Sequence, residues 1–443
     1  MKKMLTYLRY PLLLLGFTNC AFWLDKDKGN GSLQAQETVA GKNLITVTNT
    51  ANYAIYNKPC TIFRKQLGGG IAKGLFPLIT DNKGQLLPAQ LIDVDGNGEW
   101  DELFFLINAP AKTTLQYKVN WQRMAIQFAT QARVRFGKRD AKDAPVKPAL
   151  DAIFYPNMLQ KLTGFEPYQT DGPTWENDKV AFRHYFDGRN AKDLFGKRTN
   201  YMSPDSVGIA ANGQVEDNYH TLKDWGRDIL PVANSVGLGG VGLWYQQQLH
   251  RIGVTAADSV HNVEATKLKV IASGPLQGRL QMKYKNWMSY GGRTYQVQET
   301  PTIWPGMYAY QNMVRAQALQ GDESWAVGLP KVATNKQPTV LKLGKWVVLY
   351  TYDAQTYNKE YLLGMAIVVP AALYQSWAKA PDSGSFSNTY FAKLKAQNDT
   401  PITYYAIGCW ELANPAFKTE DGFVNYLNNF VGQLNASIQV TVK

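Results

Sequence analysis

The sequence predicts a mainly β protein, with a small N-terminal β-sandwich, a large antiparallel double-sheet sandwich after it, and one C-terminal helix. Many short segments alternate apolar and polar residues, which is the period of a half-buried antiparallel strand. Gly, Asp and Pro residues separate these segments. Aromatic residues make up 12% of the chain, a surplus typical of β-rich folds. With 443 residues, 45% of them apolar, the chain is long enough for two domains.

The N-terminus predicts export. Lys2, Lys3 and Arg9 form a basic region before an apolar stretch, Pro11–Phe17, that is too short to span a bilayer. We expect residues 1–35 to be a leader and spacer. The sequence "FTNC" would make Cys20 a lipidated anchor, whereas a cut near "SLQAQ" would give a simple secreted protein. We therefore expect a periplasmic or outer-membrane-anchored protein whose membrane contact is limited to a lipid on Cys20.

The first sandwich is expected over residues 40–125. Its strands are predicted at "NLITVTNT", "YAIYNKPCTIF", "LLPAQLIDV", "DELFFLI" and "TLQYKVNW". Residues 137–150, "GKRDAKDAPVKPAL", are charged and contain proline, which favours a linker.

The large domain is expected over residues 151–443. Its predicted strands include "KVAFRHYFD", "LKVIASGPLQGRLQMKYKNW", "TYQVQETPTIW", "WVVLYTYD" and "TYYAIGCWEL". A helix is predicted at "TEDGFVNYLNNFVGQLNA", because Thr419 is a suitable N-cap and the apolar residues that follow fall on one face. "SIQVTVK" then predicts a final strand.

The stretch "DVDGNGEWD" predicts a cation loop. Oxygen-bearing side chains alternate along it, and glycines between them allow a tight turn that would converge these oxygens on Ca²⁺. The expected ligands are Asp93, Asp95, Asn97 and Asp101. An EF-hand is excluded, since its twelfth position is Phe104. We expect a structural calcium ion here; the alternative is an Asp/Gly hairpin without metal.

Two polar stretches predict the functional site. "FRHYFDGRNAKD" contains Arg183, Asp187, Arg189 and Asp193, and "YHTLKDWGRD" contains Tyr219, His220, Asp224, Trp225 and Asp228. Imidazole is the side chain best suited to proton transfer near neutral pH, and an arginine can hold a carboxylate with two hydrogen bonds. The alternative is a solvated loop or a structural network of ion pairs.

Other chemistries lack support in the sequence. "GLGGVG" at 237–242 matches a dinucleotide motif, but no strand–turn–helix unit surrounds it, so we expect no nucleotide cofactor. Zinc-type Cys/His spacings and a G-x-S-x-G elbow are missing. Cys60 and Cys409 remain after the leader, and export would permit a disulfide between them. The formal charge of +12 without Lys/Arg blocks favours an anionic polysaccharide over nucleic acid.

Three blocks resemble a known family. "LLPAQLIDVDGNGEWDELFFLI", "WENDKVAFRHYFDGRNAKDLFGK" and "YHTLKDWGRDILPVANSVGLGGVGLW" are similar to an uncharacterised family of exported Bacteroidota proteins, domain of unknown function 4861. The resemblance implies a galactose-mutarotase-like β-supersandwich and a place beside polysaccharide-degrading enzymes, often for glycans that contain uronic acids. It implies no catalytic residues.

These observations leave two hypotheses. The first is an enzyme acting on an acidic oligo- or polysaccharide. As a lyase it would use His220 or Tyr219 as the base and Arg183 or Arg189 to neutralise the uronate carboxylate. As a glycoside hydrolase it would use two carboxylates, with candidates Asp187, Asp193, Asp224 and Asp228. The second is a non-catalytic glycan-binding or surface-assembly protein, with a stacking platform made of Trp175, Trp225 and Trp244.

Overall fold

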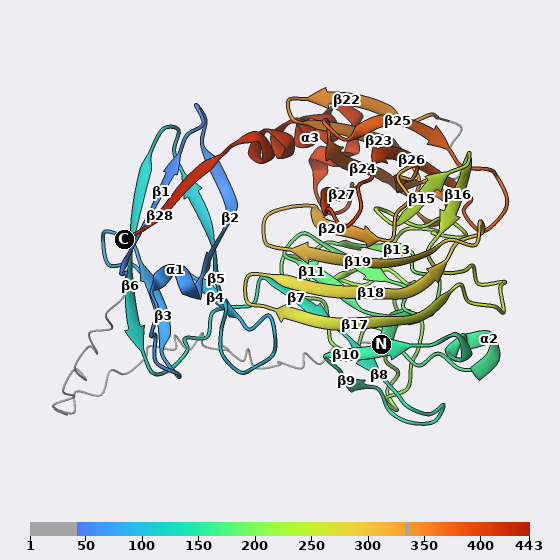
Figure 1. The fold of residues 1–443 in the computed structure, drawn as a ribbon, viewed down its shortest axis with the longest axis horizontal. Coiled ribbons are helices and arrows are strands. Elements are labelled where there is room, and N and C mark those ends of the chain that lie inside the picture. Colours follow the sequence, from blue (N-terminus) through green and yellow to red (C-terminus); the bar gives the residue numbers. More distant parts are fainter. Residues whose placement is uncertain (1–41, 333–335) are drawn as a thin grey trace, which may run out of the picture. The chain divides into compact units, whose positions relative to one another are not determined.

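The computed structural model describes residues 42–332 and 336–443, which belong to one compact unit. The predicted leader, its cleavage sites and Cys20 lie outside the described residues. The mainly β class and the C-terminal helix are confirmed (Figure 1). Every pairing between named strands is antiparallel, and long strands dominate the described chain.

Two N-terminal sheets are formed by residues within 44–122 and by the last strand of the chain (Figure 1). The first has the order β28-β1-β6-β3, with β28 (Ile438–Val442), β1 (Leu44–Asn49), β6 (Thr114–Gln122) and β3 (Phe76–Thr80). The second has the order β2-β5-β4, with β2 (Ile55–Phe63), β5 (Glu102–Ala109) and β4 (Ala89–Ile92). A short helix, α1 (Arg64–Leu67), follows β2. The final strand was expected within the large domain, but its residues pair with β1, Ile45 lying opposite Val442.

A nine-stranded sheet, called the large sheet below, is the largest element of the fold (Figure 1). Its order is β10-β17-β18-β19-β20-β27-β24-β23-β22. The strands are β10 (Asp151–Phe154), β17 (Val263–Ser273), β18 (Gly278–Met288), β19 (Thr294–Ile303), β20 (Ala309–Gln317), β27 (Ile402–Trp410), β24 (Leu362–Pro370), β23 (Trp346–Ala354) and β22 (Thr339–Leu343).

Two further sheets have five strands each. The site sheet has the order β14-β13-β12-β11-β7, with β14 (Gly226–Asp228), β13 (Lys192–Lys197), β12 (Val180–His184), β11 (Thr174–Asn177) and β7 (Ala132–Arg135). The third sheet comprises β16 (Gln248–Arg251), β15 (Val241–Tyr245), β21 (Ser324–Pro330), β26 (Thr389–Lys395) and β25 (Tyr374–Lys379). The segment predicted as a linker forms a small pair, β8 (Gly137–Lys138) with β9 (Lys147–Pro148).

Helices are few. The predicted C-terminal helix is α3 (Glu420–Asn435), and the Thr419 side chain accepts a hydrogen bond from the Gly422 amide at 3.1 Å, as an N-cap should. The remaining helical turns are α2 (Gln160–Thr163), η1 (Pro156–Met158), η2 (Gln169–Asp171), η3 (Tyr357–Lys359) and η4 (Pro415–Lys418). Among the described residues, none of the helices combines the length and apolar character needed to cross a bilayer.

One continuous apolar core joins the large sheet, the site sheet and the third sheet, and it includes fully buried Trp175, Trp287, Trp325 and Trp410. A second core fills the N-terminal sheets. Cys60 and Cys409 are both buried and both free thiols, so the disulfide that export would permit is not formed. The fold is therefore held by apolar burial and buried polar contacts.

Gln90 connects the N-terminal sheets to the large sheet. Its side-chain oxygen accepts hydrogen bonds from the amides of Leu276 and Gln277 at 2.8 and 2.7 Å, and its nitrogen donates to the Gln277 carbonyl at 3.2 Å. Gln90 is 4% exposed, so water cannot replace these bonds. Beside it, Arg279 forms an ion pair with Glu102 at 2.6 Å.

Replacing Gln90 by Leu is expected to lower the free energy of unfolding by about 2–4 kcal/mol, because two buried amides lose their acceptor. Chemical denaturation would measure this. Gln116→Leu, on an exposed position of β6, serves as the control and should change stability by about 0.5 kcal/mol or less. Equal effects of the two variants would contradict the role given to Gln90.

Candidate functional site

Strands β12, β13 and β14 of the site sheet bring the two predicted stretches together. Arg183 on β12 lies directly opposite Asp193 on β13, and β13 pairs with β14, which ends at Asp228. Arg183 donates to the hydroxyl of Tyr185, two positions further along the chain, at 2.6 Å, so these two side chains lie on the same face. The site is therefore built on rigid strands.

Arg183 is the centre of a buried ionic network. Its guanidinium contacts Asp193 through Nε at 3.1 Å and through Nη2, which also donates to Asp228 Oδ2 at 2.9 Å. The arginine side chain is 1% exposed and both aspartates are 0% exposed. The rings of Tyr185 and Tyr219 lie against the guanidinium, with centroids 4.4 and 5.0 Å from its carbon. This packing fixes the arginine in one orientation.

His220 stands at the solvent edge of this network. Its Nδ1 is 3.7 Å from Asp228 Oδ2, and its side chain is 45% exposed. Tyr357 lies edge-on to the imidazole at 5.9 Å. Burial, reinforced by the charge of Asp193, raises the pKa of Asp228 well above its usual range, although Arg183 opposes this. A buried carboxyl thus faces one imidazole nitrogen while the rest of the ring meets water.

Arg189 forms the second half of the site. It contacts Asp187 at 2.6 Å and Asp171 at 3.4 Å, and its guanidinium carbon is 3.7 Å from the centre of the Tyr185 ring. Asp171 is also 3.5 Å from Arg183, so this aspartate joins the two arginines. One continuous chain of contacts therefore runs from His220 through Asp228, Arg183 and Asp171 to Arg189 and Asp187.

A hollow of about 270 Å³ opens beside Arg189 and Asp187. Its other lining residues include Leu159, Gln160, Thr255 and Asp258. Arg189 and Asp171 are 24% and 20% exposed, so both are accessible to a ligand.

Three carboxylates gather under Arg189. Glu166, Asp171 and Asp187 each place an oxygen within 4.8 Å of the others. Burial, with the charges of Asp171 and Asp187, raises the pKa of Glu166 well above its usual range. One Glu166 oxygen accepts the Tyr168 amide at 2.9 Å and the other has no partner. Arg189 supplies positive charge beside these carboxylates, and its charge opposes the rise in the pKa of Glu166.

The loop predicted to hold calcium brings its carboxylates together. Asp93, Asp95 and Asp101 place one oxygen each within 4.8 Å of the others. Asp93 accepts amide hydrogen bonds from Gly96 and Gly98, each at 2.7 Å. Asn97, the fourth expected ligand, donates from its side chain to Asp95 at 3.0 Å. The geometry is compatible with oxygen ligation of a hard cation.

Burial corrects several predicted roles. The three tryptophans cannot form a stacking platform, since Trp175 is 0% exposed and Trp225 is 6% exposed. Trp244 is partly exposed but stacks on Phe391 in the third sheet.

Four polar residues are also misassigned. Arg183 and Asp193 are sealed from solvent, so neither can contact a substrate. Tyr219 is 1% exposed and donates to Asp217 at 2.8 Å, and burial raises the pKa of its hydroxyl, which makes it a poor base. Asp224 is exposed and has no hydrogen bond or ion pair with the network among the described residues.

Sequence reasoning missed Asp171, Glu166 and Tyr357. Tyr357 lies far along the chain and no local pattern marks it. Asp171 follows Thr170, and both have positive φ angles, 56° and 52°, a conformation that non-glycine residues adopt rarely and that tends to occur at functional sites. The sequence "QTDGPT" suggests only a turn.

The glycines of "GLGGVG" serve packing. Gly237 has φ of 75°, and a Cβ there would lie 1.7 Å from the Lys192 carbonyl oxygen. The motif lets the loop approach the site sheet closely.

Glu166→Gln should make stability less sensitive to alkaline pH. The native pKa of Glu166 lies above its unfolded value, so the native state loses stability as pH rises through that range, at about 1.4 kcal/mol for each pKa unit of the shift. The melting temperatures of the parent and the variant should coincide near pH 4. At pH 8 the variant should melt at the higher temperature. A variant less stable at every pH would show that Glu166 is ionised and paired with Arg189.

Comparisons with known proteins identify the family to which the chain belongs. The sequence is similar to "Uncharacterized protein P7" of Formosa agariphila, with 24% identity over 298 residues, which are 63% of this chain and 69% of that protein. The fold is similar to a glycosyl hydrolase family 38 protein (8% identity, TM-score 0.48) and to an alpha-mannosidase (10% identity, TM-score 0.43), both from Enterococcus faecalis. Each match covers 90% of this chain, which spans about half of those chains, 47% and 46%. A family profile matches residues 47–440 and confirms the resemblance noted in the sequence. The chain belongs to the family described as Domain of unknown function (DUF4861).

Proposed function

We propose that this protein is an exported enzyme that cleaves glycosidic bonds in an acidic, uronic-acid-containing oligo- or polysaccharide, with His220 as the proton-transfer group. The observation that carries the proposal is the placement of His220. Its ring is half-exposed, and its Nδ1 faces the buried Asp228 carboxyl at 3.7 Å. A carboxyl at one nitrogen orients the ring and leaves the other nitrogen for a substrate or a water molecule.

Asp228 and Arg183 are positioning residues in this proposal. Asp228 sets the orientation of the imidazole, and Arg183 holds Asp228 at 2.9 Å. Because both side chains are buried, neither touches the sugar. Arg183 lies on β12, which has paired strands on both sides, whereas Asp228 lies on the edge strand β14, which pairs with β13. The hydrogen bond from Arg183 to Asp228 supports a fixed geometry at this edge.

Hydrolysis fits the charges better than β-elimination. A lyase needs an arginine free to neutralise the substrate carboxylate, but Arg183 is buried and Arg189 is paired with Asp187 and Asp171. Carboxyl groups, by contrast, are in surplus.

Asp171 is the acid that can reach a substrate, since it is 20% exposed and burial raises its pKa. In the proposed step Asp171 protonates the glycosidic oxygen as the C–O bond breaks. His220 accepts the proton of the attacking water.

His220→Ala should abolish turnover while retaining most substrate affinity. Purified protein would be incubated with a panel of uronic-acid glycans, following both reducing ends and the ultraviolet absorbance of unsaturated uronates. Asp224→Asn is the matched control from the same stretch, because its side chain is exposed and outside the network, and it should keep full activity. Reducing ends without ultraviolet absorbance would support hydrolysis, whereas absorbance would establish elimination. Binding without any product would favour the alternative of a glycan-binding protein.

The proposal includes a structural Ca²⁺ ion at Asp93, Asp95, Asn97 and Asp101. The convergence of three carboxylates supports it. Lys269 of β17 also donates to the carbonyls of Val94 and Asp95, each at 3.2 Å, so the loop is attached to the large sheet. Within the loop, the amides of Gly96 and Gly98 donate to Asp93, and these hydrogen bonds curve the loop around the proposed calcium site. The ion would therefore fasten a loop and take no part in bond cleavage.

Calcium should raise the melting temperature by a few degrees, and a chelator should reverse the shift. A ligand at 100 times its Kd adds about 2.7 kcal/mol of stability. Asp95→Asn should lose the response without losing the fold. The amide oxygen of the new side chain can still accept the Asn97 amide, as Asp95 does at 3.0 Å, and the bonds from Gly96 and Gly98 to Asp93 stay in place. A chelator that leaves melting unchanged would reject the calcium site. One that abolishes activity with the fold intact would move the chemistry to this loop.

A further inference from the structure

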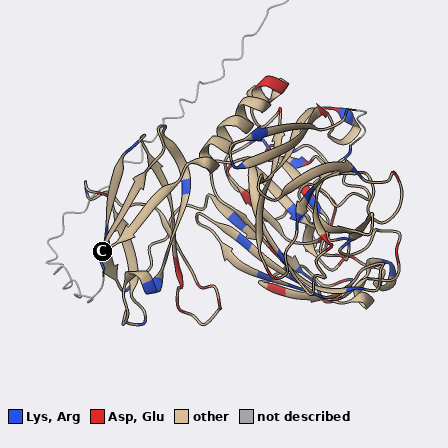
Figure 2. Cartoon of the chain, turned by 45° about the horizontal axis from the view of Figure 1, so that its top comes forward, with Lys and Arg blue, Asp and Glu red and all other residues tan. Residues whose placement is uncertain are grey.

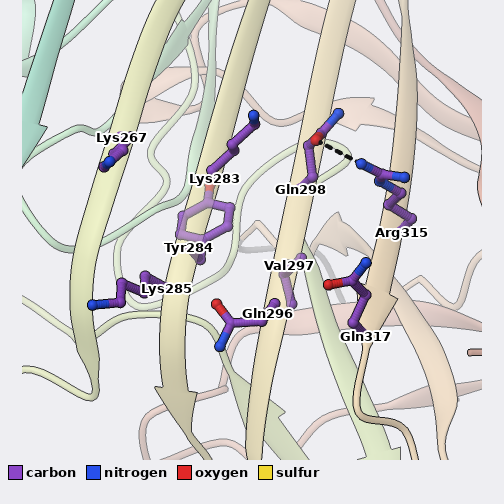
Figure 3. Close-up of a pocket in the computed structure, with 9 residues that line it drawn as sticks. All are labelled: Lys267, Lys283, Tyr284, Lys285, Gln296, Val297, Gln298, Arg315 and Gln317. Carbon is purple, nitrogen blue, oxygen red and sulfur yellow. Dashed lines mark hydrogen bonds between the residues drawn. The ribbon is translucent and has the colours of Figure 1, made fainter. Parts of the chain in front are cut away.

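The outward face of the large sheet carries a row of long cationic and amide side chains, the lysine row. Lys267 on β17 lies opposite Lys283 on β18, Lys283 lies opposite Gln298 on β19, and Gln298 lies opposite Arg315 on β20. Figure 3 shows these four side chains on neighbouring strands. Three spacings between paired strands give the row a length of about 14 Å.

Two hollows of about 340 and 490 Å³ lie along the row and share Lys267 and Lys283. Their further polar lining includes Lys138, Lys269 and Gln281 on one side, together with one carboxylate, Asp151, which lies opposite Lys269. On the other side it includes Lys285, Gln296 and Gln317. Figure 2 shows Lys and Arg positions side by side on neighbouring strands of this sheet. The row is therefore the middle of a longer cationic groove.

Carboxylates neutralise only part of this surface. Lys285 pairs with Glu264, and Arg315 lies 3.5 Å from Asp399 and donates to Gln298 at 3.2 Å. Across residues 42–332 and 336–443, no carboxylate pairs with Lys267 or Lys283.

Directly opposed like charges on neighbouring strands destabilise a sheet. Two unpaired lysines in that position therefore weaken the fold, and an anionic ligand between them would remove the repulsion.

We infer that the lysine row binds a linear anionic polysaccharide, through its sulfate or carboxylate groups. The interleaved glutamines support a sugar, because an amide can both donate to and accept from hydroxyl groups. Nucleic acid is disfavoured, since single strands bind on exposed aromatic rings and the aromatic ring in this lining, Tyr284, is 1% exposed with its hydroxyl bonded to Glu299 at 2.7 Å.

This surface is distinct from the proposed catalytic network. None of its lining residues belongs to that network, whose accessible groups are His220, Asp171 and Arg189. Binding at the row needs no turnover, and the inference rests only on the acidic-glycan part of the proposed function. Such a surface would hold a polymer on the protein while the catalytic network acts on another part of the same polymer.

The test is binding of the full chain to polygalacturonate, dextran sulfate and uncharged dextran, with duplex DNA as a fourth probe. We expect binding to the anionic glycans alone, weakening steeply with salt. Lys267→Gln/Lys283→Gln should weaken binding at least tenfold. Lys73→Gln/Lys83→Gln, with the same charge change at exposed positions of the N-terminal region, should leave binding unchanged. The two anionic probes distinguish carboxylate from sulfate recognition.

Thermal melting and catalysis complete the test. Lys267→Gln/Lys283→Gln should melt at the same temperature as the parent or higher, because the opposed charges are removed, and should still cleave a short oligosaccharide. His220→Ala should keep binding at the row. The inference would be overturned if Lys267→Gln/Lys283→Gln left the affinity unchanged, or if Lys73→Gln/Lys83→Gln lowered it equally. It would also be overturned if DNA bound more tightly than either anionic glycan.

Discussion

The arrangement of the site depends on one buried guanidinium. Arg183 holds Asp193 across the β12–β13 pair and Asp228 from β14, so it connects three neighbouring strands through side chains as well as backbone. Two carboxylates surround this one guanidinium, and burial together with the charge of Asp193 raises the pKa of Asp228. Such a network stabilises little by itself. Its value is positional, because His220 and Asp171 are both placed by contact with its members.

The sequence revealed local features of the fold and only part of the site. Alternation and turn residues predicted the strands, and Thr419 with acids after it predicted helix α3. The polar stretches around Arg183 and His220 do converge, since strand pairing brings β12 and β14 to either side of β13. Burial was not predictable: Trp175 resembles a sugar-stacking residue by type, yet it packs on Phe182 and Tyr310. Asp171 and Tyr357 come to the site through tertiary contacts with residues distant in the sequence, which no local sequence pattern predicts.

Charge is distributed unevenly between the two surfaces. The catalytic network contains more carboxylates than arginines, and its arginines are neutralised internally. The lysine row has the opposite balance and carries unpaired cations. The formal charge of +12 is thus not spread evenly over the molecule. A polyanion would be attracted to the lysine row, which favours attachment of a long polymer at this surface.

The pairing of β28 with β1 constrains how the chain folds. Ile45 and Val442 are partners although almost the whole described chain separates them. Closing so long a loop costs entropy before the pairing repays it, and contacts this distant in sequence slow folding. Until residues 438–442 have been synthesised, β1 presents an open edge to other chains. Completion of the sheet that contains β1 therefore waits until residues 438–442 have been synthesised, although its other strands emerge much earlier.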